Sequence, residues 1–264
     1  MSSTVLKALS LLEHFSELEP ELGLSELARR SGIDKSAVHR MLGAMAESGL
    51  VEQQADTKLY RIGAGVLRLA RVRETAFPIS AFVQPVLVAL SEETGETAHA
   101  SLISGASLGN IGTAESKRGN RVSLIAGEVL PFHSTASGFS VMAFGDESLM
   151  KKALSRQRAG KTPFTLTEAE DIRAKVETVR ANGYSESDQT NEVDVHGLAA
   201  PVFDRTGQAC GAVSVATPSH RVTEEGRKKT IGAVLRAARK ITDGLGGRVP
   251  QDYALLIDGL MGTQ

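Results

Sequence analysis

The sequence predicts an α+β protein of two domains, and three observations support this prediction. The chain has 264 residues and is 41% hydrophobic, which is enough apolar material for more than one core. Its first 62 residues show three short helical patterns followed by two strand patterns, the order of a winged helix-turn-helix. Beyond Pro78, helical stripes alternate with pairs of strand-like segments, as in an antiparallel sheet with flanking helices.

The composition argues against several classes of protein. Cys210 is the single cysteine, which excludes an internal disulfide and the usual cysteine zinc sites. No apolar run approaches the ~20 residues that span a bilayer, and Met1–Thr4 does not begin a signal peptide. We therefore expect a cytoplasmic protein with no membrane partner. The formal net charge is −1, so any binding to nucleic acid has to depend on local charge.

Three helical patterns open the chain. The first carries Val5, Ala8, Leu9, Leu12 and Phe15 at helical spacing. In the second, Ser25 is placed to cap a short helix that stops near Ser31-Gly32. The third repeats apolar residues at i, i+3, i+4 and i+7 and should end at Gly49 in a left-handed conformation; its residues are Val38, Met41, Leu42 and Met45.

The second and third helices have the order of a helix-turn-helix, whose second helix enters the major groove of DNA. On that helix Lys35, Ser36, His39 and Arg40 fall on the exposed first turns, where they can reach bases and phosphates. Ser25, at the start of the bracing helix, is expected to contact DNA as well. Taken alone, this pattern fits equally well a small helical domain with a solvated charged face.

A hairpin after the third helix favours the DNA-binding interpretation. Leu50–Gln53 and Leu59–Ile62 look like two strands, and Lys58 and Arg61 would contact phosphates from this wing. Positions 27–46 also hold a local basic excess of three. It comes from four cations and one carboxylate, which are Arg29, Arg30, Lys35 and Arg40 against Asp34.

The remaining elements follow from periodicity and turn residues. A linking helix is expected from Gly63 to Arg73, and a second helix follows Pro78, with Pro85 inside it, and ends before Gly95. Strands, further helices and a polar stretch that runs to Pro163 come next. The predicted elements are strands at 97–103, 108–114, 198–203 and 209–216 and helices at 135–144, 167–181 (opened by a capping box at Thr167) and 223–243.

Several ordered segments resemble bacterial transcription regulators of the IclR type over residues 4–243. The segments that carry the resemblance are Leu24–Ala28, Gly32–Leu42, Gly49–Val51, Tyr60–Gly63, Pro131–Gly138, Arg180–Tyr184, Leu198–Asp204 and Gly211–Val215. Two positions depart from the family pattern: Asp34 stands where proline is frequent and Phe139 where many members have lysine. The resemblance implies a winged helix on operator DNA and a C-terminal GAF-like sensor domain for a small metabolite, often a carboxylate.

Residues 135–138 show how such a metabolite would be bound. Thr135, Ala136, Ser137 and Gly138 open a helix whose free backbone N–H groups favour an anion, and the two hydroxyls can donate hydrogen bonds. On local sequence alone, a simple helix cap fits equally well. The resemblance favours a ligand site.

The resemblance also brings residues of later segments to the opposite wall. They are Ser187 and Asp188 on a loop, Gly197 at a strand start, and Ser214 and Ala216 on the last strand. Ser214 alternates with two valines and should face one side of the sheet alone. Other members often have a second serine at the position of Ala216 and a larger side chain at that of Gly197. We therefore expect a less polar, roomier pocket that suits a ligand larger than a two-carbon acid.

A catalytic interpretation was considered and is not favoured. Ser137, His133 and Asp188 contain the residue types of a hydrolase triad, but the G-x-S-x-G elbow is missing. The six histidines lack the short spacing of a metal-ligand pair, although His99 and His196 could approach one another across the sheet. No cofactor, no bound metal and no enzymatic activity are expected.

The sequence thus predicts a ligand-responsive regulator with a winged helix at 1–62, a linker helix at 63–77, a sensor domain at 78–244 and a tail at 245–264. Its expected partners are double-stranded operator DNA, a small-molecule effector and a second copy of itself in a homodimer or tetramer. Two alternatives stay open. One is a GAF-like sensor whose head binds a protein, and the other is a small-molecule hydrolase.

Overall fold

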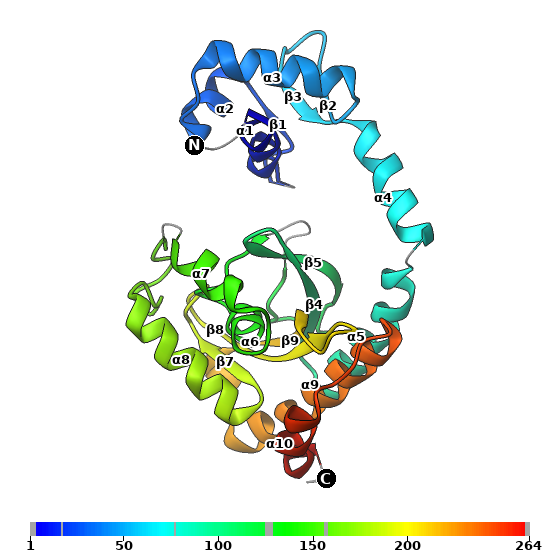
Figure 1. The fold of residues 1–264 in the computed structure, drawn as a ribbon, viewed down its shortest axis with the longest axis vertical. Coiled ribbons are helices and arrows are strands. Elements are labelled where there is room, and N and C mark those ends of the chain that lie inside the picture. Colours follow the sequence, from blue (N-terminus) through cyan, green and yellow to red (C-terminus); the bar gives the residue numbers. More distant parts are fainter. Residues whose placement is uncertain (1–3, 17, 77, 125–128, 156–157, 262–264) are drawn as a thin grey trace. The chain divides into compact units, whose positions relative to one another are not determined.

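A computed structural model describes residues 4–16, 18–76, 78–124, 129–155 and 158–261. The chain forms two compact units, of which the smaller ends at Pro78 and the larger begins at Ile79 (Figure 1). The smaller unit contains helices on a small sheet. Its elements are α1 (Thr4–Ser10), η1 (Leu11–His14), β1 (Glu21–Leu22), α2 (Leu24–Ser31), α3 (Lys35–Glu47), β2 (Val51–Gln53), β3 (Tyr60–Ile62) and α4 (Ala64–Ala76).

Local signals set the bounds of the helix-turn-helix. Gly32 ends α2 in the left-handed conformation, and the Asp34 carboxylate accepts hydrogen bonds from the amides of Ser36 and Ala37 at the start of α3. The prediction that Ser25 caps the second helix is wrong. The cap position is Gly23, and Ser25 lies inside α2, because the helix begins one residue before it.

The wing is a three-stranded antiparallel sheet in the order β1-β3-β2. Glu21–Leu22 was not predicted as a strand, since two residues show no periodicity. One apolar cluster binds the helices to this sheet. Its buried members are Leu11, Leu22, Leu27, Val38, Leu42, Met45, Val51 and Tyr60.

The larger unit is built on a six-stranded antiparallel sheet in the order β6-β5-β4-β9-β8-β7. The strands are β4 (Thr97–Ser104), β5 (Ser107–Ala114), β6 (Val129–Leu130), β7 (Ser185–Asp188), β8 (Val195–Phe203) and β9 (Ala209–Pro218). The helices are α5 (Ile79–Thr94), α6 (Ala136–Phe144), α7 (Glu147–Ser155), α8 (Ala169–Asn182), η2 (Ser219–Arg221), α9 (Glu224–Gly244) and α10 (Gln251–Met261).

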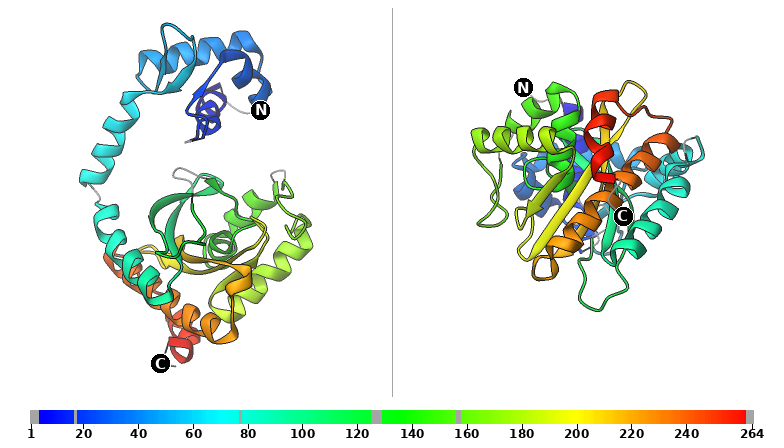
Figure 2. Two further views of the ribbon diagram at one scale, coloured as in Figure 1. Left: turned by 180° about the vertical axis from the view of Figure 1, so that it is seen from behind. Right: turned by 90° about the horizontal axis from the view of Figure 1, so that it is seen from below.

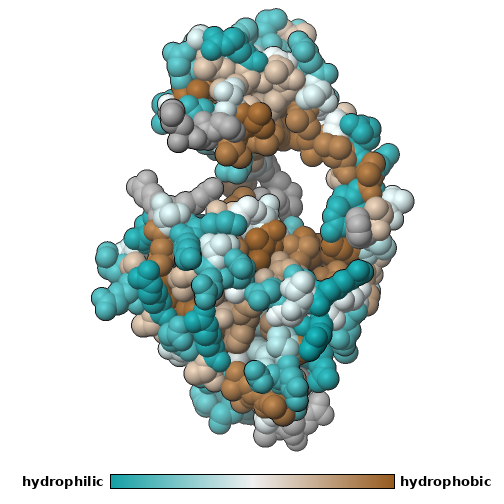
Figure 3. All heavy atoms as spheres, viewed as in Figure 1, coloured by the Kyte–Doolittle hydropathy of each residue, from teal (hydrophilic) through white to brown (hydrophobic). Residues whose placement is uncertain are grey.

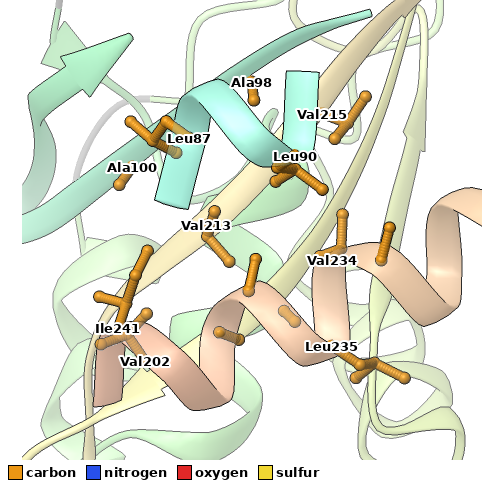
Figure 4. Packing of buried hydrophobic residues seen from close by; sticks show 14 of the residues in the cluster. Leu87, Leu90, Ala98, Ala100, Val202, Val213, Val215, Val234, Leu235 and Ile241 are labelled. Carbon is orange, nitrogen blue, oxygen red and sulfur yellow. The ribbon is translucent and has the colours of Figure 1, made fainter. Parts of the chain in front are cut away.

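Helices cover both faces of this sheet, with α6, α7 and α8 on one side and α5, α9 and α10 on the other (Figures 1 and 2). Strand alternation sorts the side chains between the two layers. Val213 and Val215 of β9 pack with Leu87 of α5 and Val234 of α9 (Figure 4). The residues between them, such as Ser214, face the α6 side. The predicted α+β architecture of a winged helix-turn-helix and an antiparallel sheet with flanking helices is confirmed.

Three local predictions for this unit are corrected. The stretch before Pro163, expected only to be polar, contains the amphipathic helix α7. Ser187 and Asp188 both lie on β7 rather than on a loop, because pairing with β8 makes a strand of residues with low strand propensity. The expected capping box at Thr167 does not form. Helix α8 begins after Glu168, and no side chain accepts a hydrogen bond there.

The C-terminal segment from residue 245, in which no element was predicted, contains α10. The Tyr253 hydroxyl donates a hydrogen bond to the Gly183 carbonyl at 2.7 Å, and the ring packs edge-on against Phe144 and Phe203. Ile257 is buried in the same core. This helix therefore completes the core on the α9 side of the sheet.

Among the described residues, no single helix is long and apolar enough to cross a membrane. By length and composition alone, only a bent pair made of α4 and α5 could do so.

Candidate DNA interface and ligand cavity

The first turns of α3 present a polar surface to solvent. Lys35, Ser36, His39 and Arg40 are all exposed, while Val38 and Leu42 of the same helix are fully buried. The Ser36 hydroxyl donates to the Asp34 carboxylate at 2.6 Å and accepts from Arg40 at 3.4 Å. The face expected to read bases is thus solvent-accessible, with Arg40 held loosely by its neighbour.

A groove runs between this face and the wing. It is lined by Ser25 and Arg29 of α2, Lys35 and His39 of α3, and Lys58 at the tip of the wing. Lys58 adopts a positive φ of 59° in the turn between β2 and β3, and its side chain is exposed. Four of the seven residues predicted to contact DNA therefore line this groove, and Ser36 and Arg40 lie on the adjoining exposed face of α3.

The charge of this surface is smaller than the sequence count suggests. Arg29 and Arg30 both pair with Glu26, and Arg30 also pairs with Glu19 at 2.7 Å. Hydrogen bonds from Arg29 and Arg30 lower the pKa of the Glu26 carboxyl to about 2. The count of three excess positive charges within residues 27–46 is correct, but Glu19 and Glu26 precede that window and pair with Arg29 and Arg30, so the accessible positive charge is smaller.

Arg61 of the wing is engaged in the same way. Its guanidinium pairs with Glu52 at 3.1 Å and approaches Glu21 at 3.9 Å. Glu52 also accepts a hydrogen bond from the first amide of α4. In the described part of the smaller unit, Lys35, Arg40 and Lys58 are the cations of this surface that make no ion pair.

The larger unit holds a cavity between the start of α6 and the sheet. Its atom-free space, with the open mouth included, measures about 520 Å³. Strands β4, β7, β8 and β9 form its floor, and the loop after β7 and the segment after β5 form its rim. It is lined by His99, Val122, Leu124, Leu130, Thr135, Ala136, Ser137, Ser187, Asn191, Glu192, Val195, Gly197, Ser214 and Ala216.

The start of α6 is fixed by hydrogen bonds to the surrounding loops. The Thr135 hydroxyl accepts from the Gly138 amide at 3.0 Å and donates to the Pro131 carbonyl at 2.7 Å. The Thr135 hydroxyl proton is thus bound within the protein, and Thr135 serves as the cap of α6. The Ser137 hydroxyl, 2% exposed, has no partner in the described structure. The amides of Ala136 and Ser137 begin the helix, where the helix itself supplies no acceptor.

The sheet contributes the polar groups on the cavity wall that faces α6. His99 of β4 lies directly across from Ser214 of β9, so both face the cavity. The Ser214 hydroxyl donates to the Leu198 carbonyl at 3.0 Å and can still accept a hydrogen bond. His99 is 6% exposed, its Nδ1 has no partner among the described residues, and burial lowers its pKa to about 4.

The structure gathers seven of the nine predicted effector residues around this cavity and leaves out two. Gly138 does not line it and instead packs on the Phe132 backbone, where a Cβ atom would collide. Asp188 alternates with Ser187 along β7 and accepts a hydrogen bond from Ser219 at 3.2 Å. The extra room expected at Gly197 is taken by Ser187, whose Oγ would lie 2.7 Å from an added Cβ.

Sequence reasoning missed His99 and Asn191 as lining residues. His99 lies in a predicted strand, but its place across from Ser214 depends on the register of β4 against β9, which the sequence does not give. Asn191 carried no sequence signal. Its Oδ1 accepts from the Ser134 hydroxyl at 2.9 Å, a contact between residues far apart in the sequence.

The proposed approach of His99 and His196 does not occur. His99 pairs with Ser214, whereas His196 pairs with Thr217, so strand alternation points the two rings to opposite faces. The His196 ring lies 3.5 Å from Glu186. Within the described ranges, no group of three or more His, Cys, Asp or Glu side chains could hold a metal ion.

The residues of the hydrolase alternative do not form a triad. Ser137 Oγ lacks any hydrogen-bond partner among the described residues, while a ring nitrogen of His133 lies 3.2 Å from the Ala159 carbonyl. Asp188 bonds to Ser219 instead of a histidine. The nucleophile–base and base–carboxylate contacts that activate a serine are therefore missing from this arrangement.

A second cleft lies on the other face of the sheet, beside the start of α9. Several of its charged groups are engaged with one another, since Arg118 and Arg221 both bind the buried Glu96, at 2.8 and 2.7 Å. Arg227 binds Glu186 at 2.6 Å. Burial would raise the pKa of Glu186, but hydrogen bonds from His196 and Arg227 lower it to about 2. This network accounts for the polar lining of the cleft.

Comparisons with known proteins cover both units. Models of the IclR helix-turn-helix domain and of the C-terminal domain of bacterial IclR transcriptional regulators match residues 4–55 and 74–243. The transcriptional regulator KdgR of Dickeya chrysanthemi is 31% identical, over 92% of this chain and 80% of its own.

Solved structures of this kind are similar as well. An IclR transcriptional regulator from Silicibacter sp. TM1040 is 38% identical, with a TM-score of 0.86 and coverage of 95% of this chain and 99% of that one. An IclR homologue from Microbacterium hydrocarbonoxydans, in complex with 4-hydroxybenzoate, is 22% identical and shares the fold, with a TM-score of 0.71 and coverage of 92% and 99%.

Proposed function

The chain belongs to the IclR family of bacterial transcription regulators, and we propose that it reads operator DNA with α3 and the wing while the cavity beside α6 binds a carboxylate effector. The observation that carries the proposal is the pairing of two features in one chain. Within the described residues, the winged helix exposes three cations that make no ion pair, and the larger unit encloses buried polar atoms that have no hydrogen-bond partner. A regulator that responds to a metabolite needs both.

At the DNA, we assign base reading to Arg40 and phosphate contact to Lys35 and Lys58. Arg40 is exposed on the second turn of α3, where a guanidinium can bind guanine in a bidentate manner. Ser25, Ser36 and His39 are assigned to supporting contacts, as is Arg61, which must share its charge with Glu52. The DNA in the bacterial cytoplasm is then the partner, and we expect the protein there.

At the cavity, we assign the effector carboxylate to the start of α6. The amides of Ala136 and Ser137 and the unpartnered Ser137 hydroxyl offer donors to an anion at a helix N-terminus. Ser187, Gly197, Ser214 and Ala216 enclose the rest of the ligand. The Microbacterium homologue holds an aromatic carboxylate, which agrees with this ligand class.

We also infer a homodimer that forms through the smaller unit. Large apolar side chains are exposed on α1 and α4, which gather on one side of this unit (Figure 3). Val5 of α1 is 66% exposed, and Leu67 and Val72 of α4 are 66% and 61% exposed. A contiguous apolar surface of this kind marks an interface, and two copies would present recognition helices to two half-sites.

We propose no catalytic role for the cavity. Ser137, the nucleophile of the hydrolase alternative, lacks a base within hydrogen-bond reach among the described residues. The relatives named above are transcription regulators. The protein should therefore not convert its effector. Mass spectrometry of the effector after a day of incubation with the protein should find the compound chemically unchanged.

Binding of the protein to its own upstream region tests the DNA proposal. Arg40→Ala should weaken specific binding by about 1–3 kcal/mol and relax the preference at one base pair per half-site. Lys58→Ala should weaken binding to all sequences alike and reduce the salt slope by about one unit. Lys151→Ala on α7 removes an equal charge from an exposed residue of the larger unit and is the matched control.

Electrophoretic mobility shift or fluorescence anisotropy at several salt concentrations measures all three variants. Arg40→Ala protein that binds this promoter with the affinity and selectivity of the wild type would show that α3 does not read bases.

A further inference from the structure

Two buried polar atoms of the cavity have no hydrogen-bond partner in the described structure. They are His99 Nδ1 on the sheet and Ser137 Oγ on α6. Both side chains are more than nine-tenths buried. Such groups are rare in folded proteins because burial without a partner is unfavourable, and each needs an explanation. A ligand that bonds to both would supply it.

Three other polar side chains of the cavity are bonded within the protein. Thr135 caps α6 and binds the Pro131 carbonyl, and Ser214 donates to the Leu198 carbonyl. Asn191 Oδ1 accepts from the Ser134 hydroxyl. These groups hold the walls in place. Among the described lining residues, His99 Nδ1 and Ser137 Oγ are the fully buried side-chain atoms that a ligand has still to satisfy.

The charge of the lining limits the ligand further. No lysine or arginine of the described chain lines the cavity, and Glu192 lies at its rim. Burial without a counter-charge keeps the His99 imidazole neutral, since its pKa falls to about 4. One carboxylate can bind the amides at the start of α6. A second carboxylate beside His99 would be buried without a cation, which is strongly unfavourable.

A neutral imidazole is suited to an uncharged polar group. It carries one N–H donor and one acceptor nitrogen, and so can bond to a hydroxyl or a keto oxygen. His99 and Ser214 lie side by side on adjacent strands, so a single hydroxyl can donate to one and accept from the other. The two ends of the cavity thus differ in chemistry.

We propose that His99 is a specificity-determining residue that selects monocarboxylates bearing a hydroxyl or keto group and rejects dicarboxylates. The inference depends on the proposed carboxylate site at α6, because that site fixes the other end of the ligand. Sites with buried polar groups of this kind discriminate strongly against analogues that leave them unpaired.

Matched probes test this on the full chain. The probes are benzoate with the 2-, 3- and 4-hydroxybenzoates, butanoate with 3-hydroxybutanoate, and succinate, measured by thermal shift and calorimetric titration. In the wild type, at least one hydroxylated acid should bind about 10-fold or more tightly than its unsubstituted match. Succinate should bind at least about 10-fold more weakly than 3-hydroxybutanoate.

Three variants isolate the role of His99. His99→Leu keeps the volume and removes the polar atoms, and the hydroxyl preference should fall to about 3-fold or less. His99→Asn keeps a polar atom near Nδ1 and should restore part of the preference. Ser101→Ala is the control, because Ser101 is equally buried and unpartnered on the same strand but does not line the cavity.

The outcomes separate this inference from the proposed function. If His99→Leu binds hydroxylated and plain acids with the wild-type ratio, or if succinate binds best, His99 does not select the ligand and the inference is wrong while the carboxylate site stands. If no carboxylate stabilises the wild type, the carboxylate site and the inference both fall. Loss of all carboxylate binding in Ser137→Leu supports the carboxylate site. A preference for hydroxylated acids that is seen only in the wild type and in His99→Asn supports the role of His99.

Discussion

The packing of α10 can be measured through Tyr253. Its hydroxyl binds the Gly183 carbonyl at the end of α8, and its ring lies 4.9 Å from the centroids of both Phe144 and Phe203. Tyr253→Phe removes the hydrogen bond and leaves a buried carbonyl unpaired, which costs about 1–2 kcal/mol of unfolding free energy. Tyr253→Ala also removes the ring, and the total loss should be about 4–6 kcal/mol.

These losses translate into melting temperatures. A unit of this size loses about 2–4 °C per kcal/mol, so we expect drops of about 2–8 °C for Tyr253→Phe and about 8–24 °C for Tyr253→Ala. Scanning calorimetry of the full chain at one protein concentration is the suitable assay, since the chain has no tryptophan to report by fluorescence. Leu255→Ala is the control, because that side chain of α10 is 67% exposed.

The melting temperatures of the two variants, compared with that of the wild type, test the role of α10. If Tyr253→Ala melts within 2 °C of the wild type, α10 does not form part of the core. If the phenylalanine and alanine variants melt alike, the hydrogen bond matters but the aromatic contacts do not.

Three further predictions concern the units, their assembly and pH. The fragment 78–264 should fold alone, keep its affinity for carboxylates and lose operator binding. In the full chain, effector and operator should change each other's affinity by the same factor, which titrations of the protein with the two ligands in either order measure. Replacing Leu67 and Val72 by aspartate should dissociate the dimer without unfolding the monomer, and unchanged sedimentation would exclude α4 from the interface. Because the pKa of His99 is about 4 in the folded state and 6.5 in the unfolded chain, protons bind the unfolded chain first, and stability is lost as the pH falls from about 6.5 to 4. Between pH 8 and pH 5 the wild type should lose about 2 kcal/mol more than His99→Asn, measured by calorimetry; an equal loss would show that His99 is not buried as a neutral ring.

Sequence patterns predicted most of the DNA-reading unit because its elements depend on near neighbours. The spacing of Val38 and Leu42 sets the buried face of α3, and the same spacing leaves Lys35 and Arg40 outside. Gly32 and Gly49 adopt the left-handed conformations that end helices, which only local backbone sterics require. The start of α6 at Thr135 was found for the same reason, since a helix cap involves residues within three positions.

The effector cavity could be predicted only in part. Ser137 and Ser214 were assigned through the resemblance, and strand alternation predicted which way Ser214 faces. His99 could not be assigned in the same way, because its place across from Ser214 depends on the register of β4 against β9, and no local pattern encodes the register of distant strands.

The sequence by itself determined the helix-turn-helix, the α+β architecture of two domains and the polar face of α3, because these follow from periodicity and short-range capping. The tertiary structure alone decided which charges remain available and which polar groups meet. Glu19 neutralises Arg30, His99 joins Ser137 around one cavity, and Tyr253 fastens the last helix to Gly183. Each of these contacts joins residues well separated along the chain. Their energies depend on distance and burial in space, which the one-dimensional pattern does not contain.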